Sequence, residues 1–240
     1  MRLDIELVNR NLYPTRAKAV TAIKFGLVFV NSIRAEKSSQ IIKEFDEVKV
    51  NYLPFASGRG SLKLAHALDH FKVNPAGLTC LDVGASTGGF TEVLLNRGAA
   101  KVFAVDVGTD QMIMGLKSDS RVVSLENTDI RTLPPIAPID LAVIDVSFIS
   151  LLDVAPAIAK WKPRQIIALI KPQFEVPRAV AAKHKGIIKS EKYHAEGIEK
   201  VLHGFASLGF KNCGVVQSPI TGGSGNVEYL TLFSNLYSNT

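Results

Sequence analysis

The sequence predicts an α/β protein in two parts, a small N-terminal α/β unit and a larger unit built on a mostly parallel, seven-stranded sheet. Two observations predict the larger unit. Short apolar runs alternate with helical patterns from residue 61 onward, and a glycine-rich turn follows the first of these runs. A stretch rich in proline, glycine and small residues lies between the two parts. We therefore expect one domain at 1–51, a linker at 52–60 and a second domain at 61–240.

The composition is ordinary for a globular protein, because 47% of the 240 residues are hydrophobic and 21% are charged. No apolar run approaches the ~18 residues that a membrane-spanning helix needs, so we expect no membrane partner. The N-terminus shows no apolar core of a secretion signal. Two cysteines are too few for a disulfide framework or a multi-cysteine metal site, which favours a reducing cytoplasm and no bound metal.

The N-terminal part is predicted to form two short helices and two short strands. Apolar residues recur with helical spacing up to Pro14 and again after Thr15, and strands at 27–31 and 48–50 follow. Residues 1–35 hold six arginines and lysines against two acidic residues, a net charge of +4 out of +6 for the chain. This concentration favours a nucleic-acid partner, although a solvated helix face would give the same count. The candidate contacts are Arg2, Arg16, Lys18 and Lys24, with Arg59 in the linker.

The larger part is predicted to alternate strands and helices. The expected strands are 79–83, 102–107, 122–125, 141–145, 166–170, 213–217 and 229–233. The expected helices are 62–71, 88–97, 111–117, 152–160 and 192–208. Only a loop separates the last two strands, so they should form a hairpin in which the last strand runs antiparallel to the others.

The stretch Leu-Asp-Val-Gly-Ala-Ser-Thr-Gly-Gly-Phe at 81–90 places a glycine-rich turn between a strand and a helix, where backbone amides can face a ligand. A dinucleotide site requires G-x-G-x-x-G, but Ser86 occupies the second glycine position. The spacing favours S-adenosylmethionine, which carries no pyrophosphate. Asp106 ends the next strand, where a carboxylate can bind ribose hydroxyls, and Asp129 and Ile130 can hold the adenine. The expected cofactor contacts are Gly84, Ala85, Ser86, Thr87, Gly88, Gly89, Phe90, Asp106, Val107, Asp129, Ile130 and Phe148.

Four charged residues are predicted at the carboxyl edge of the sheet, where ligands bind in open α/β folds: Lys63, Asp145, Lys171 and Glu228. Each lysine alone would be interpreted as a solvated surface residue. Together they suit the methylation of a ribose 2′-hydroxyl, which is a poor nucleophile until it loses its proton. A lysine beside a second cation can act as the base. We assign Lys171 as the base, Lys63 as the neighbouring cation, and the two carboxylates as the groups that orient them.

Two other methylation chemistries are disfavoured. Amine-directed enzymes more often carry an Asn/Asp-Pro-Pro-aromatic turn where residues 145–148 are Asp-Val-Ser-Phe. Methylation of a base carbon needs a cysteine nucleophile in the site. Cys80 and Cys213 fall within predicted strands, so we expect both to be small buried side chains and not nucleophiles.

These motifs resemble the TlyA family, which has also been called hemolysin. Thr15-Arg16 with Gly26-Leu27-Val28-Phe29-Val30-Asn31 is similar to the small RNA-binding module of a ribosomal protein and of pseudouridine synthases. The stretches at 82–91, 144–151, 171–175 and 225–228 resemble that family's methyltransferase motifs, in order along nearly the whole chain. The resemblance implies a Rossmann-like, FtsJ-like domain and 2′-O-methylation of ribosomal RNA cytidines, with a tetrad at Lys63, Asp145, Lys171 and Glu228.

Two alternatives remain open at this point. One is an RNA-binding assembly factor whose methyltransferase domain is inactive, although the intact tetrad argues against it. The other is a pore-forming protein, which only the family's second name suggests. We expect a cytoplasmic monomer that acts on ribosomal RNA or ribosomal subunits.

Overall fold

The computed structural model describes residues 1–10, 12–13, 15–24, 28–43, 45–50 and 59–237. The chain divides into two compact units, Met1–Pro54 and Phe55–Thr240, and each is described by itself. The expected linker lies outside the described residues except for Arg59 and Gly60. Gly60 already begins a helix of the second unit.

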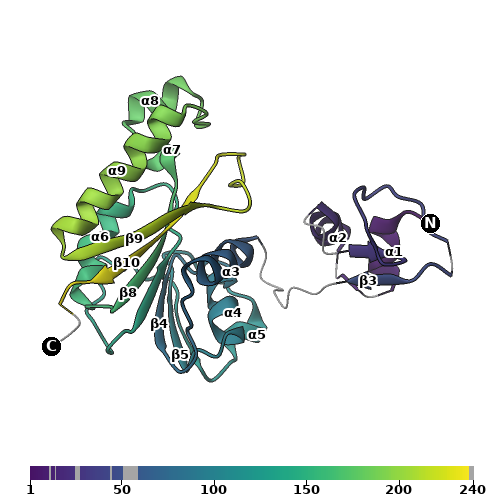
Figure 1. Cartoon of the computed structure of the whole chain (residues 1–240). Helices are drawn as coiled ribbons and strands as arrows, with labels where there is room; N and C mark the ends of the chain where they lie inside the picture. The colour runs from purple at the N-terminus through teal and green to yellow at the C-terminus, as the bar shows by residue number, and fades with distance from the viewer. Residues whose placement is uncertain (11, 14, 25–27, 44, 51–58, 238–240) are drawn as a thin grey trace. The chain divides into compact units, whose positions relative to one another are not determined.

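The first unit packs two helices against a small antiparallel sheet (Figure 1). Its elements are α1 (Leu3–Asn9), α2 (Arg16–Lys24), β1 (Val28–Val30), β2 (Ile33–Arg34) and β3 (Val48–Val50), with strand order β2-β1-β3. The helical spacing of the apolar residues buries Leu3, Leu7 and Ile23 together with Val28 in one core. Strand β2 was not expected, because two residues are too few to show a pattern. Leu27, expected to open the first strand, lies outside the described residues.

The second unit is built on a seven-stranded sheet with the order β6-β5-β4-β7-β8-β10-β9. The strands are β4 (Thr79–Val83), β5 (Lys101–Val105), β6 (Val122–Leu125), β7 (Leu141–Ile144), β8 (Gln165–Ile170), β9 (Phe210–Gln217) and β10 (Tyr229–Asn235). Strand β10 inserts between β8 and β9 and runs antiparallel to both, which confirms the expected mostly parallel sheet with an antiparallel last strand. The strand order reverses between β4 and β7, and ligands bind at such a switch point.

Helices cover both faces of this sheet (Figure 1). They are α3 (Gly60–Phe71), α4 (Gly89–Asn96), α5 (Met114–Lys117), α6 (Leu151–Lys160), α7 (Pro172–Glu175), α8 (Arg178–Lys183) and α9 (Glu191–Ser207). Alternate strand residues enter two separate cores. Cys80 packs with α3 and α4, whereas its neighbour Leu81 packs with α6 and α9. The two-residue period of the strands therefore fixes which helices lie on which face.

Several boundaries differ from the prediction. Strand β5 ends at Val105, two residues early, because the chain turns there so that Asp106 accepts a hydrogen bond from the Ser86 backbone. Strand β7 likewise ends at Ile144, so that Asp145 follows the strand. Helix α5 begins only at Met114. Helices α7 and α8 were missed, because four and six residues show no periodicity.

The two cysteines lie in different environments. Cys80 is fully buried, as expected, and burial raises the pKa of its thiol to about 12. The prediction for Cys213 was wrong, since this residue is exposed. It lies in β9, the edge strand, whose middle residues are only partly covered. Within the described part of the chain, no helix has the length and apolar character needed to cross a membrane.

Candidate active site

The glycine-rich turn between β4 and α4 lies against the end of β7. Gly84 has φ +83°, and a Cβ placed on it would lie 2.5 Å from the carbonyl oxygen of Asp145. The backbone of Asp145 also donates a hydrogen bond of 2.9 Å to the Val83 carbonyl. Only glycine fits at this position. The turn and the residue that follows β7 are consequently held in direct contact.

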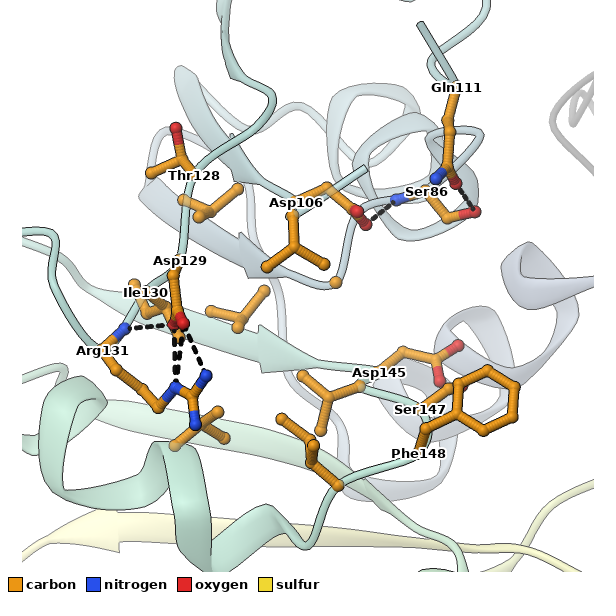
Figure 2. A pocket seen from close by; sticks show the side chains of 17 residues that line it. Ser86, Asp106, Gln111, Thr128, Asp129, Ile130, Arg131, Asp145, Ser147 and Phe148 are labelled. Atoms are coloured by element: carbon orange, nitrogen blue, oxygen red, sulfur yellow. Dashed lines mark hydrogen bonds and ion pairs between the residues drawn. The ribbon is translucent and has the colours of Figure 1, made fainter. Parts of the chain in front are cut away.

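Ser86 and Asp106 connect the turn to the end of β5. The Ser86 backbone N–H donates to Asp106 Oδ2 at 2.7 Å, and the Ser86 hydroxyl donates to Gln111 at 3.0 Å (Figure 2). The other Asp106 oxygen accepts from the Gly108 backbone at 2.7 Å. Asp106 was expected to bind ribose hydroxyls. Each of its oxygens already accepts one bond and retains a second lone pair for such a ligand. Gln111, which the sequence did not single out, is part of the same network.

A cavity of about 430 Å³ opens at the switch point of the sheet, between the turn and the ends of β5, β6 and β7. Seven expected cofactor contacts line it: Gly84, Ser86, Asp106, Val107, Asp129, Ile130 and Phe148. A smaller cavity of about 140 Å³ also borders the turn, and the expected contacts that line it are Gly84, Ala85, Ser86, Thr87, Gly89 and Phe90. Asp145 lines both cavities. Gly88, with φ +96°, is the residue that precedes α4, and its Cα faces Leu116.

The wall formed by residues 129–131 holds an ion pair that the sequence analysis did not predict. The Arg131 guanidinium lies 2.6 Å from Asp129 Oδ2 (Figure 2). Its hydrogen bonds hold the pKa of Asp129 below the ordinary value. Arg131 also lines the cavity, and Ile130 contributes a buried apolar surface. The negative charge of Asp129 is therefore balanced by Arg131, and the apolar contact comes from Ile130.

The four predicted catalytic residues form two separate ion pairs. Lys171 Nζ lies 2.7 Å from Asp145 Oδ1 and donates a hydrogen bond of 2.6 Å to the Ser147 hydroxyl. Lys63 Nζ lies 2.5 Å from Glu228 Oε2. Both lysines are buried. Lys63, which we assigned as the neighbour of Lys171, is thus bonded to Glu228, because α3 carries it to the residue that precedes β10. Ser147 is a partner of Lys171 that sequence reasoning missed.

A fifth carboxyl group lies beneath the turn. Asp82, on β4, is fully buried and accepts a hydrogen bond of 2.6 Å from the Thr91 hydroxyl. Its other oxygen, Oδ1, has no hydrogen-bond partner in the described structure. Burial, with a smaller contribution from the charge of Asp145, raises its pKa to about 7. Its place in an apolar strand gave no sign of this in the sequence.

The candidate RNA contacts fall into three groups. In the first unit Arg2 and Arg16 both bind the fully buried Asp4, at 3.0 and 2.8 Å. The hydrogen bond from Arg2 is the largest of the contributions that hold the pKa of Asp4 well below its usual range. Both arginine side chains remain partly exposed. The side chains of Lys18 and Lys24 lie outside the described residues. Arg59 belongs to the second unit, where it donates to the Thr221 carbonyl and lines the smaller cavity.

Comparisons with known proteins show the family of the chain. Residues 56–235 match the FtsJ-like methyltransferase family, and residues 1–48 match the S4 domain. The chain is 42% identical, over 95% of its length and 87% of the relative, to the 16S/23S rRNA (cytidine-2′-O)-methyltransferase TlyA of Mycobacterium tuberculosis. It is 37% identical to Hemolysin A of Brachyspira hyodysenteriae, over 97% and 99% of the two chains. A solved structure from Streptococcus thermophilus superimposes with a TM-score of 0.74 at 38% identity, covering 99% of this chain and 89% of that one.

Proposed function

The chain belongs to the TlyA family of FtsJ-like methyltransferases, and we propose that it methylates the ribose 2′-hydroxyl of a cytidine in ribosomal RNA with S-adenosylmethionine. The observation that carries the proposal is the pair of buried Lys171 and partly exposed Asp145, in which Asp145 lines both cavities beside the glycine-rich turn. A lysine held there can accept a proton from a hydroxyl that enters the site. The Mycobacterium tuberculosis relative is named for this same reaction.

The larger cavity suits the cofactor. Its volume of about 430 Å³ lies within the range of small-molecule sites. Asp106 and the exposed backbone of the turn can bind the ribose and the amino-acid part. Ile130 and Val107 supply apolar surface for the adenine. When bound, S-adenosylmethionine supplies an electrophilic methyl group on a positively charged sulfur, and the carboxylate of Asp145 favours that charge.

Lys171 is the residue that moves the proton. With its amino group uncharged, Nζ takes the 2′-hydroxyl proton while the ribose oxygen forms a bond to the methyl carbon. Bound S-adenosylmethionine would supply the methyl carbon and would keep the electron pair of the broken carbon–sulfur bond. Asp145, 2.7 Å from Nζ, then stabilises the ammonium group. Ser147 orients the amine through its hydroxyl.

The first unit supplies RNA affinity, in accord with its match to the S4 domain. Asp4 holds the guanidinium groups of Arg2 and Arg16 in place while part of each side chain stays exposed. Two positioned cations of this kind suit phosphate contacts. The substrate is then ribosomal RNA or a ribosomal subunit, and the reaction takes place in the cytoplasm.

Transfer of a radiolabelled methyl group to purified ribosomal subunits, followed by mapping of 2′-O-methyl positions, tests the proposal. We expect label on cytidine ribose with wild-type protein and none with Lys171→Ala. Tight RNA binding without transfer would favour an assembly factor. Leakage from liposomes without transfer would favour the lytic activity that the name of the Brachyspira hyodysenteriae relative implies.

A further inference from the structure

The loop from Asp145 to Ser150 carries two of the three groups at the proposed base and has a strained backbone. Phe148, in its middle, has φ +68° and an 88% exposed side chain. A bulky residue rarely adopts this conformation, and such strain persists only where the surroundings over-determine it. The Phe148 ring lies 5.5 Å, between ring centroids, from that of Phe174 on α7, while most of its surface remains exposed. Hydrogen bonds and a close backbone contact fix the loop at its two ends.

The first end is fixed by the sheet. Asp145 donates its backbone N–H to Val83, and its carbonyl lies against Gly84. The second end is fixed by Glu175, which is 2% exposed. Glu175 Oε2 accepts from the Ser150 hydroxyl at 2.5 Å, and Oε1 accepts from the Leu151 backbone at 2.8 Å.

Glu175 lies in the segment that carries Lys171. Helix α7 follows Lys171 directly, and the Phe174 backbone donates to the Lys171 carbonyl at 2.8 Å, so the two residues belong to one rigid turn. Helix α9 holds this turn from behind. Lys200 Nζ donates to the Glu175 carbonyl at 2.8 Å, and a Cβ on Gly197 would lie 3.3 Å from that of Glu175.

We propose that Glu175 is a positioning residue, which joins the turn carrying Lys171 to the strained loop carrying Asp145 and Ser147 and so sets their contact. The inference rests on the proposed function for its kinetic consequence. Its structural consequence, an ordered 145–150 loop, is independent of that function. A carboxylate at the start of α6 also caps that helix, and the test must separate capping from positioning.

Asp153 provides the matched control. It caps the same helix, accepting the Ser150 backbone N–H at 3.0 Å, but it makes no bond to the Lys171 turn in the described structure. We expect Glu175→Ala and Asp153→Ala both to lower the melting temperature. Only Glu175→Ala should lower the single-turnover rate, at saturating cofactor and RNA, by ~30-fold or more. Equal rate losses in the two variants, after correction for folded fraction, would overturn the proposal.

Hydrogen exchange of the full-length protein without RNA gives a readout independent of methyl transfer. Amides of residues 146–149 should exchange at least ~10-fold faster in Glu175→Ala than in Asp153→Ala. Glu175→Gln keeps an oxygen for the Leu151 N–H and an amide that can donate to Ser150, so it should retain the rate within ~3-fold. A positioning role would be contradicted if the loop amides of Glu175→Ala exchanged as slowly as those of the wild-type protein. It would also be contradicted if the single-turnover rate of Glu175→Gln were as low as that of Glu175→Ala.

Discussion

The two lysine–carboxylate pairs of the second unit are alike in composition and differ in surroundings. Lys63 and Glu228 are separated by 165 residues in sequence, and both side chains are less than a tenth exposed. In the other pair Asp145 is 20% exposed, lines two cavities and shares Lys171 with a serine hydroxyl. One pair is enclosed by the protein, whereas the carboxylate of the other opens onto the two cavities beside the glycine-rich turn. This difference predicts that the first pair stabilises the fold and the second performs chemistry.

The largest expected effect is at the open pair. Lys171→Ala should lower the single-turnover rate by ~10³-fold or more, because loss of a general base costs two to four orders of magnitude. Lys171→Arg should be as inactive, since arginine stays protonated in proteins and cannot accept the hydroxyl proton.

Isothermal titration should show little change in cofactor affinity for either Lys171 variant, because the loss lies in the chemical step. A Lys171→Arg variant that kept most of its rate would show that the lysine acts by its charge alone.

The closed pair should matter most for stability. Lys63→Ala leaves Glu228 buried without its cation, and breaking a buried pair costs about 3–5 kcal/mol in free energy of unfolding. Lys171→Ala should cost less, because the partly exposed Asp145 can be solvated. Urea denaturation of both variants and of the double variant Lys63→Ala/Glu228→Ala measures this. Equal losses for the two lysines would remove the distinction between the pairs.

The meeting of Asp145 and Lys171 followed from the sequence for a simple reason. Both residues come directly after parallel strands that are neighbours in the sheet, so strand prediction alone brings them to one edge. The glycine-rich turn was recognisable because its spacing is a local property of the chain. The same local signals gave the seven strands and the antiparallel last one.

The partners of Lys63 and Asp129 did not follow from the sequence. Lys63 meets Glu228 only because α3 docks beside β10, and such docking depends on the packing of the whole core. Arg131 lies two residues from Asp129, but this spacing does not by itself predict that the two side chains form an ion pair. Glu175 lies in a four-residue helix that is too short to show a period. The sequence analysis could therefore not specify which side chains of distant segments pair with one another.

A smaller effect should come from Asp82. The charge of Asp145 helps to raise the pKa of Asp82, so this residue belongs to the surroundings of the Lys171–Asp145 pair. The ordinary pKa of the Asp82 carboxyl is 3.8, and its pKa in the folded protein is about 7. Between these two pH values the folded protein binds a proton at Asp82 that the unfolded chain does not bind. The free energy of unfolding should accordingly fall as pH rises through that range. Asp82→Asn keeps a partner for Thr91 and removes the titration, so its free energy of unfolding should decline less between pH 5 and 8, by about 3 kcal/mol. Identical pH profiles would contradict a neutral Asp82.

The smallest effect should lie outside both pairs, in the first unit. Arg16→Ala leaves Asp4 bonded to Arg2, so the unit should stay folded, and it removes one exposed guanidinium that can bind a phosphate. The slope of log affinity for ribosomal RNA against log salt should flatten by about one contact. The single-turnover rate at saturating RNA should not change, because neither lysine pair is touched.

Arg121→Ala is the matched control, since Arg121 is an exposed arginine paired with Asp119 at the start of β6, away from the strand ends that form the cavity. If Arg121→Ala flattened the slope as much as Arg16→Ala, the loss would reflect net charge, and RNA binding could not be attributed to the arginines that Asp4 holds.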